Sequence, residues 1–424
     1  EVIPAARHDE LKLSGDQKER LAALQKGVDA KLAELLNDEQ NKQISDMRSG
    51  RGRGGPGGPG GFGNRRPPDD IYRWELHCLD RATGKTLWSQ TALESKPRIP
   101  IERSNTYATE TPVTDGERVY AYFGMHGVYC YDFAGNLIWK KDLGAFPMSG
   151  GWGTASSPVL DGKRLFVLCD NEQESFLVAL DALTGDELWR VARSESTSYA
   201  SPFVWRNKLR TEIIALGSPK VRSYDPATGK QLWELTIGNG RCTASPVGNA
   251  EMLFVGLDAG GGGPMGRGQR GEDAGGEDSA SGMFAVSAGA TGDLDSRDGD
   301  AATGGVVWNS RQNGPTTASP LLYDGYIYIV KRDGGILTCL DAETGEQVYR
   351  KRIPGAKAFW SSPWAAEGKV YFADDAGTTF VIKSGPEFEV LGQNEIDEMV
   401  WASPAAADGA IFLRGVDHLY CIGE

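Results

Sequence analysis

Hydrophobic and polar residues alternate with the two-residue period of β-strands from residue 71 to the end of the chain. The strings Arg118-Val-Tyr-Ala-Tyr-Phe123 and Tyr326-Ile-Tyr-Ile-Val330 show the pattern clearly. Turn residues separate such strings, as in Asp115-Gly116 and Asp324-Gly325. Short alternating runs between turns are typical of half-buried strands. The pattern therefore predicts that residues 71–424 consist of strands and turns.

One pattern of about eleven residues recurs in this region and predicts a β-hairpin. Its clearest copy is Ala179-Leu-Asp-Ala-Leu-Thr-Gly-Asp-Glu-Leu-Trp189, and further copies begin at Cys78, Cys130, Ser223 and Cys339. Apolar residues lead to an Asp and a turn, and the second strand ends in an aromatic residue. The Asp can accept hydrogen bonds from backbone amides ahead of it, and Gly can adopt the positive φ of a tight turn.

A second feature, a pair of mostly small residues before a proline, divides the region into units of about 44 residues. The seven prolines are Pro112, Pro158, Pro202, Pro246, Pro320, Pro363 and Pro404. One longer interval contains an insertion rich in Gly, Asp and Ala at residues 258–304. Each unit contains four strands, and four antiparallel strands in a repeat of this length form one blade of a β-propeller.

The number of blades depends on the hairpin at residues 74–90, which no proline marker precedes. It could complete the unit that starts at Pro404, which would give seven blades. That unit, however, already has a third strand at residues 418–422, in the same phase as residues 75–79. We therefore favour an all-β, eight-bladed propeller of four-stranded antiparallel blades, with seven blades as the alternative. By this count the first blade is incomplete and its other strands precede Glu1.

A tryptophan ends the equivalent strand of five hairpins: Trp88, Trp139, Trp189, Trp233 and Trp308. A large flat ring at a fixed place in each blade can wedge against the next sheet. Residues 380–392 lack this tryptophan, so we expect that blade to be degenerate.

Four of the six cysteines share one position of the repeat: Cys78, Cys130, Cys339 and Cys421. Other copies place Ala or Ser there, so the position should be a small buried site on a strand. Equivalent positions on different blades should be too far apart for a disulfide, and we expect free structural thiols. The pattern leaves Cys169 and Cys242 undetermined.

The N-terminal region differs in composition from the propeller. Ser14 with Gln17, and Asn37 with Gln40, have the spacing of capping boxes, so residues 1–48 should form a helical hairpin inserted in the first blade. Residues 49–70 are rich in Gly, Pro and Arg, which is typical of a flexible linker.

Charge and hydropathy limit the function classes. The net charge is −13, and the acidic excess lies within residues 71–424, which argues against nucleic-acid binding. No apolar run reaches the roughly 18 residues of a membrane-spanning helix. The chain begins at Glu1 rather than Met, so we expect a signal peptide upstream and a periplasmic or secreted protein.

The repeat at residues 179–189 resembles the hallmark Ala-x-Asp-x-x-Thr-Gly-x-x-x-Trp of the pyrroloquinoline-quinone (PQQ)-like β-propeller family. The resemblance covers residues 71–424. It implies one of two kinds of protein. Quinoprotein alcohol dehydrogenases bind PQQ and calcium in the central funnel, whereas the BamB-like branch is non-catalytic and serves as an interaction scaffold. The pattern is most similar to that of envelope proteins without an assigned activity.

The loops before the proline markers should open at one mouth of the funnel. Candidate ligand-binding residues in these loops are Tyr107, Glu110, Trp152, Tyr199, Arg241, Trp360 and Trp401. Aromatic rings with one Arg could receive a flat anionic ligand or a partner peptide, or they could plug the narrow end of the funnel. Glu110 replaces the small residues of other copies, and it could be a calcium ligand or a solvated loop acid.

We assign no catalytic residue and no metal site. The chain lacks the adjacent cysteine pair of the alcohol dehydrogenases, and the acidic segment 293–300 lacks the spacing of an EF-hand loop. We therefore expect a non-catalytic propeller without a cofactor that binds an envelope protein or a small ligand. The alternative is a PQQ-dependent quinoprotein oxidoreductase with PQQ and calcium, and a third possibility is a sugar-binding propeller.

Overall fold

The computed structural model describes residues 14–35, 66–102, 105–257, 282–294 and 305–423, which belong to two units, Glu1–Asn64 and Arg65–Glu424. In the first unit the described chain is one helix, α1 (Gly15–Leu35). It begins as the capping box predicts, because Gln17 N donates to Ser14 Oγ at 3.3 Å and Ser14 N donates to Gln17 Oε1 at 2.8 Å. The predicted second helix lies outside the described residues, as does the linker up to residue 65.

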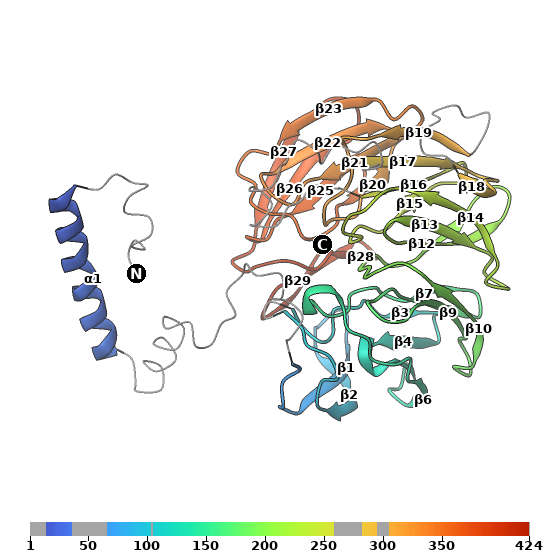
Figure 1. The fold of residues 1–424 in the computed structure, drawn as a ribbon, viewed down its shortest axis with the longest axis horizontal. Helices are drawn as coiled ribbons and strands as arrows, with labels where there is room; N and C mark the ends of the chain where they lie inside the picture. Colours follow the sequence, from blue (N-terminus) through green and yellow to red (C-terminus); the bar gives the residue numbers. More distant parts are fainter. Residues whose placement is uncertain (1–13, 36–65, 103–104, 258–281, 295–304, 424) are drawn as a thin grey trace. The chain divides into compact units, whose positions relative to one another are not determined.

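The second unit consists of antiparallel sheets that follow one another along the chain (Figure 1). The first three blades have the strands β3 (Val113–Thr114), β4 (Arg118–Tyr122), β5 (Val128–Asp132) and β6 (Leu137–Lys141); β7 (Val159–Asp161), β8 (Arg164–Cys169), β9 (Ser175–Asp181) and β10 (Glu187–Arg193); and β11 (Phe203–Arg206), β12 (Thr211–Leu216), β13 (Lys220–Tyr224) and β14 (Gln231–Thr236). Two short 3₁₀ turns lie in this part, η2 (Gly124–His126) and η3 (Ser149–Gly151).

The next three blades have the same four-stranded order. Their strands are β15 (Val247–Gly248), β16 (Met252–Leu257), β17 (Gly282–Ser287) and β19 (Val306–Ser310); β20 (Leu321–Tyr323), β21 (Tyr326–Val330), β22 (Ile336–Asp341) and β23 (Gln347–Arg352); and β24 (Trp364–Ala366), β25 (Lys369–Ala373), β26 (Thr378–Lys383) and β27 (Val390–Glu395). Two smaller sheets contain β28 (Ala405–Ala407), β29 (Ala410–Arg414) and β30 (Leu419–Ile422), and β1 (Tyr72–Leu79) with β2 (Thr86–Ser95).

Within the described residues, seven sheets have three or more strands, so the propeller has the seven blades of the alternative count. The hairpin β1–β2 forms a separate two-stranded sheet and does not pair with β30. The separate sheet agrees with the sequence pattern, in which the first strand of this hairpin occupies the same position of the repeat as the third strand of the last unit. It is the hairpin that the eight-blade count assigns to an incomplete first blade.

The first strand of every blade begins directly after its proline marker, and a belt of hydrogen bonds joins these points. At each junction the backbone N–H of the residue before proline donates to the hydroxyl of the matching Ser in the next blade, at 2.8 to 3.0 Å. The six bonds run from Thr111 to Ser157, Ser201, Ser245, Ser319, Ser362 and Ser403. The belt therefore links all seven blades through the small residue that precedes each proline.

The repeated tryptophan joins neighbouring blades at the opposite end of the sheets, as predicted. Trp139 Nε1 donates to the carbonyl oxygen of Ala182 in the next blade at 3.0 Å. Its ring lies against Gly185, where a Cβ atom would come within 2.6 Å of the indole. The Gly of the Thr-Gly pair therefore provides both a positive φ of 76° and the space for the ring. Equivalent bonds start from Trp88, Trp189 and Trp308.

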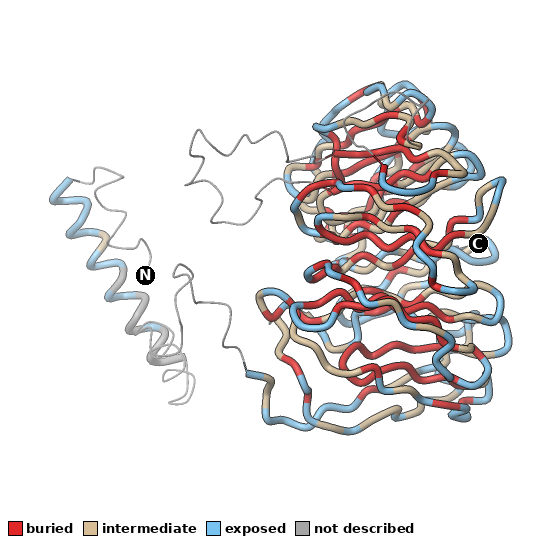
Figure 2. The backbone as a smooth tube through the Cα atoms, turned by 45° about the vertical axis from the view of Figure 1, so that its right-hand side comes forward, coloured by how far each residue is buried: buried red, intermediate tan, exposed pale blue. Residues whose placement is uncertain are grey.

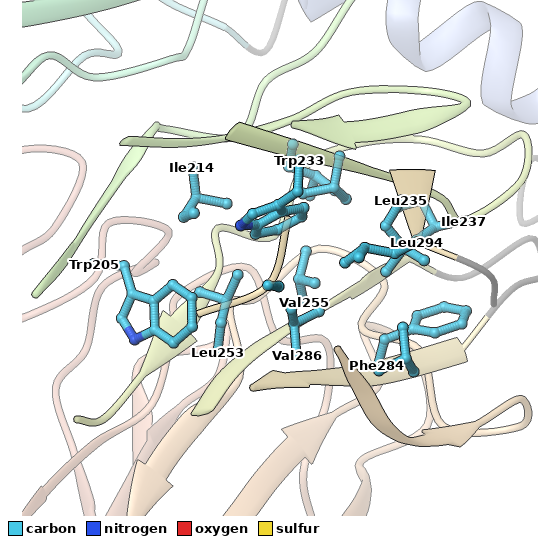
Figure 3. Packing of buried hydrophobic residues seen from close by; sticks show 14 of the residues in the cluster. Trp205, Ile214, Trp233, Leu235, Ile237, Leu253, Val255, Phe284, Val286 and Leu294 are labelled. Carbon is cyan, nitrogen blue, oxygen red and sulfur yellow. The ribbon is translucent and has the colours of Figure 1, made fainter. Parts of the chain in front are cut away.

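Trp233 differs because an extra strand covers it. The short strand β18 (Gly292–Leu294) pairs in parallel with β14, and Trp233 Nε1 donates to Glu212 Oε2 at 2.7 Å instead of to a carbonyl group. Figure 3 shows Trp233 and Leu235 facing Val255 of the next blade, with Leu294 beside them. The expected loop 258–304 thus contains two strands, β17 and β18, that belong to the sheets.

Burial is greatest in the second and third strands of the blades (Figure 2). Cys130 and Cys339 are buried there, as predicted, and all six cysteines, which are all described, are free. Cys78 is only half-buried, and the prediction was wrong for Cys421, which is exposed because β30 is an edge strand. The strand β27 has no tryptophan and is exposed along its length, as expected for a degenerate blade.

No helix within the described ranges is long and apolar enough to cross a membrane.

Replacement of Trp139 by Ala should lower the free energy of unfolding by about 3–5 kcal/mol, because the ring and its bond to Ala182 are both lost. Trp139→Phe should lower the free energy of unfolding by about 1 kcal/mol because the N–H hydrogen bond is lost, in addition to the loss caused by the smaller ring. Urea unfolding followed by circular dichroism measures both. The exposed neighbour Ile138 is the control, since Ile138→Ala should change the free energy by less than about 0.5 kcal/mol.

The adjacent residues Ser156 and Ser157 allow the loss of a belt hydrogen bond to be distinguished from the loss of a hydroxyl group alone. Ser157 Oγ accepts the bond from Thr111, whereas the buried Ser156 Oγ has no partner among the described residues. Thr111 is exposed, so its freed N–H can bind water, and Ser157→Ala should destabilise the propeller by about 0.5–1.5 kcal/mol, whereas Ser156→Ala should be neutral or stabilising. Equal losses in urea unfolding for the two variants would contradict a stabilising role of the belt.

Candidate functional site

All candidate residues lie in segments that lead into the first strand of a blade. Because the belt aligns these strands side by side, the segments approach from the same end of the blades. We call this end the mouth. It is formed by the segments before β3, β7, β11, β15, β24 and β28.

Three side chains form a stacked group at the mouth. The rings of Trp360 and Trp401 stack with centroids 5.3 Å apart and an interplanar angle of 29°. The guanidinium of Arg332 lies 5.0 Å from the centroid of the Trp360 ring, a cation–π distance. Trp401 is 38% exposed, so the pair is partly accessible to solvent. We call these three residues the Trp–Arg stack.

The chain around the Trp–Arg stack holds it in place. Phe359, which precedes Trp360, is fully buried, and its N–H donates to the carbonyl oxygen of Arg332 at 2.9 Å. Arg332 N donates to Thr316 Oγ1 at 3.0 Å, and its guanidinium pairs with Asp333 at 3.1 Å. The Trp–Arg stack therefore exposes part of an indole pair beside a guanidinium whose positive charge is largely neutralised by Asp333.

A second group of candidates lies on the blades that begin at β7, β11 and β15. Tyr199 Oη donates to the carbonyl oxygen of Ser149 at 3.4 Å, in the turn η3 that Trp152 follows. Trp152 is 40% exposed. Burial raises the pKa of Tyr199 to about 12, and the positive charge of Arg241 opposes this shift. Arg241 is exposed and has no ion pair or hydrogen bond with any described residue.

Tyr107 packs against the first hairpin instead of facing the mouth freely. Trp74 Nε1 donates to its carbonyl oxygen at 2.9 Å, and Tyr107 Oη donates to the carbonyl oxygen of Ile99 at 3.2 Å. The ring of Tyr72 lies 5.2 Å away in an edge-on contact. Burial raises the pKa of Tyr107 to about 12. These contacts give Tyr107 a role in anchoring the hairpin.

Glu110 is buried, with only 9% of the residue exposed, so it is not a solvated loop acid. Burial raises its pKa to about 7, and the hydrogen bond with Thr154 opposes this shift only in part. Its Oε1 has no hydrogen-bond partner among the described residues. Nearby, Tyr122 and Thr154 line a cavity of about 10 Å³, enough for about one water molecule.

Sequence reasoning missed a buried charge network between the second and third blades. Arg193 and Asp170 are fully buried and form a two-bond ion pair at 2.8 and 2.9 Å. Arg193 also donates to Tyr224 Oη at 2.7 Å, and Glu195 pairs with Arg222. Alternation alone could not reveal this network, because a charged residue in a strand normally indicates an exposed position. Arg332 was also missed, since it follows β21 and not a proline marker.

One alternative for Glu110 was a calcium ligand. No three His, Cys, Asp or Glu side chains within the described ranges converge as metal ligands. Calcium takes six to eight oxygen ligands, several of them carboxylates in most sites. Glu110 therefore belongs to no described group of three or more such side chains. Of the acidic segment 293–300, the residues from 295 onward lie outside the described residues.

The buried Glu110 should make stability depend on pH near neutrality. Its pKa of about 7 in the folded protein exceeds its usual 4.5, so stability is fully present below pH 4.5 and falls as pH rises through 7. The loss should be about 3 kcal/mol. In urea unfolding between pH 5 and 8, Glu110→Gln should remove this dependence. The exposed Glu117 is the control, and Glu117→Gln should leave it unchanged.

Comparison with known proteins places this fold in a family. Residues 73–252 and 296–386 match the model of the family described as outer membrane protein assembly factor BamB. The chain is similar to the crystal structure of BamB from Moraxella catarrhalis, with 12% identity, a TM-score of 0.54 and coverage of 79% of this chain and 87% of that one. It is also similar to a europium-containing methanol dehydrogenase, with 11% identity, a TM-score of 0.50 and coverage of 81% and 80%.

At these identities the two structures share only the fold with this chain. A search of the curated proteins found no match. The family model, in contrast, matches more than half of the chain. The chain therefore belongs to the BamB family of PQQ-like β-propellers.

Proposed function

We propose that this protein is a non-catalytic propeller of the bacterial cell envelope that binds a protein partner or a small ligand through its mouth. The observation that carries the proposal is the Trp–Arg stack, which leaves an indole pair partly exposed beside a guanidinium. Trp and Arg are enriched among the residues that dominate binding energy at protein interfaces. An envelope location, periplasmic or secreted, is consistent with the family to which the chain belongs.

The mouth also favours a particular kind of ligand group. Arg332 is paired with Asp333, so its charge is largely balanced, whereas Arg241 has no described partner. Partly exposed rings accompany both cations, since Trp401 stacks on Trp360 beneath Arg332, and Trp152 follows the turn that Tyr199, the neighbour of Arg241, contacts. A ligand with an apolar or flat group and one negative charge would use both features. An aromatic residue next to an acidic one in a partner protein has this chemistry.

The alternative is a PQQ-dependent quinoprotein oxidoreductase that acts on alcohols or sugars. Its support is the same set of rings with a nearby Arg, which could stack on a planar quinone. Two observations count against it. The ring of Trp360 is already in contact with an indole and a guanidinium, and the described carboxylates form no cluster for calcium. PQQ and calcium belong to the proposal only in this alternative.

Site-specific photo-crosslinking in the cell envelope tests the proposal. An aromatic photo-crosslinker at position 401 should give a discrete protein adduct, and one at the exposed outer residue Leu188 should give none. Arg332→Ala should lower the adduct yield about tenfold. Arg190→Ala is a matched control, because Arg190 also lies over a ring, that of Phe176 at 4.1 Å, and pairs with Glu187, but on an outer strand.

The same preparation separates the two functions. The purified protein, supplied with PQQ and calcium, should not reduce an electron-accepting dye when alcohols or sugars are added. Dye reduction that disappears in the Trp360→Ala variant would refute the non-catalytic proposal and support the quinoprotein alternative.

A further inference from the structure

The chain contains two Asn-Gly pairs, Asn239-Gly240 and Asn313-Gly314, and the structure places them in different surroundings. Asn239 lies at the mouth, in the segment between β14 and β15, and is exposed. Its side-chain amide has no hydrogen bond with any described residue. Asn313 is only 6% exposed, and its Nδ2 donates to Ser310 Oγ at 2.9 Å. The same dipeptide is therefore accessible at one position and held at the other.

An Asn-Gly pair can react with itself in water. The backbone nitrogen of the glycine forms a bond to Cγ of the asparagine, and the side-chain nitrogen leaves as ammonia with the proton that the backbone nitrogen gives up through solvent. Water then adds to either carbonyl carbon of the resulting cyclic imide and breaks its bond to the imide nitrogen, which leaves aspartate or isoaspartate. The net reaction consumes water, releases ammonia and converts a neutral amide into a carboxylate. It needs no oxidant or reductant, and it contributes to the heat sensitivity of asparagine in proteins.

The backbone around Asn239 permits this attack. Glycines flank the residue on both sides, and Gly238 adopts a positive φ of 86°. Gly240 has no Cβ to obstruct the approach of its nitrogen to the asparagine side chain. The N–H of Gly240 donates to Ser218 Oγ at 3.2 Å. This N–H lies in the plane of the peptide group, whereas the attack uses a face of that plane, so the hydrogen bond leaves the reacting face uncovered.

The surroundings of Asn313 oppose the same attack. Its backbone N–H donates to the carbonyl oxygen of Ser310 at 3.2 Å, and its side-chain amide donates to the hydroxyl of the same residue. The following Gly314 is buried, and its carbonyl oxygen accepts a hydrogen bond from Lys331 Nζ at 2.8 Å. Reaction at Asn313 therefore requires a local opening that breaks these bonds, and the small population of the open form limits the rate.

A carboxylate at position 239 would change the charge of the mouth. Arg241 follows shortly after Asn239, is exposed, and has no ion pair or hydrogen bond with any described residue. Its positive charge already acts on Tyr199, where it opposes the rise in pKa that burial causes. A negative charge close to Arg241 favours the charged form of its guanidinium and attracts it. The mouth would then lose a positive charge that no described group balances.

We propose that Asn239 is a site of spontaneous deamidation and that the carboxylate formed there pairs with Arg241. The modification converts the free cation of this part of the mouth into a neutral pair, and water is its only co-reactant. Neither the reaction nor the pairing depends on the function proposed above.

The two Asn-Gly pairs provide an internal comparison. The 424-residue protein is incubated at mildly alkaline pH, and peptide mass spectrometry measures the conversion of each asparagine with time. Asn239 should convert about tenfold faster than Asn313, because Asn313 reacts only from an opened state. In urea, where both pairs are exposed, the two rates should become similar. Equal rates in the folded protein would overturn the proposal, as would a difference that persists unchanged in urea.

The products and a glycine variant test the route of the reaction. The cyclic imide should give isoaspartate as well as aspartate at position 239, whereas direct hydrolysis of the amide gives aspartate alone. Gly240→Ala should slow the conversion about tenfold, because its Cβ obstructs the attacking nitrogen. Gly240 does not have a positive φ, so alanine is compatible with its backbone. Aspartate without isoaspartate, or an unchanged rate in the variant, would overturn the proposal. If the variant does not fold by circular dichroism, the products and the comparison in urea decide.

A matched pair of charge variants tests the pairing with Arg241. Phenylglyoxal reacts with the deprotonated guanidine, so an arginine beside a carboxylate reacts more slowly. In Asn239→Asp, the modification of Arg241, followed by peptide mass spectrometry, should slow about threefold. Asn394→Asp adds the same charge on the exposed outer strand β27 and should leave the rate at Arg241 unchanged. Equal rates at Arg241 in the two variants would overturn the proposed pairing.

Discussion

In six of the seven blades, a backbone amide at the inner end donates to an acceptor in the neighbouring blade. The N–H of Ser157 donates to Ser201 Oγ, and the same bond recurs at six junctions. A buried N–H without an acceptor costs about 1–3 kcal/mol, and the proline that follows provides no N–H of its own. The serine hydroxyl thus allows proline-led strands to lie side by side. At the outer end, the indole bonds of Trp139, Trp189 and Trp308 add a second point of attachment at three of these junctions.

The sequence predicted the tryptophan contacts between blades but not the serine hydrogen bonds. Trp139 recurs in a hairpin with an obvious turn, and a large ring at a repeated position has few roles other than packing on a neighbour. Ser157 lies in a pair that looked merely small, and its partner Ser201 is distant in sequence. Cys421 shows a related limit of prediction from a single repeat. Its position in the repeat predicted burial correctly for Cys130, but burial also requires adjacent strands, and no local pattern reports whether they are present.

The candidate site could be predicted only where position along the repeat determines location. Trp360 and Trp401 lie at the mouth because both precede a proline marker, and they stack as neighbours on adjacent blades can. Arg332 belongs to the same stack but follows a different strand, so the marker gave no sign of it. Glu110 also precedes a marker, yet contact with Thr154 of the next blade buries it. Burial between blades depends on side chains from two repeats, which a single repeat does not encode.

The residues that hold the ring together and those that give the mouth its chemistry are largely separate. Serine hydroxyls, glycines and indole N–H groups join the blades, whereas the Trp–Arg stack contributes no bond to the belt. The mouth can therefore change without weakening the ring. The same fold occurs in a BamB structure and in a methanol dehydrogenase, so the fold alone does not determine function. Function in this family must consequently be argued from the side chains at the mouth, and in this chain the proposal is built on the Trp–Arg stack.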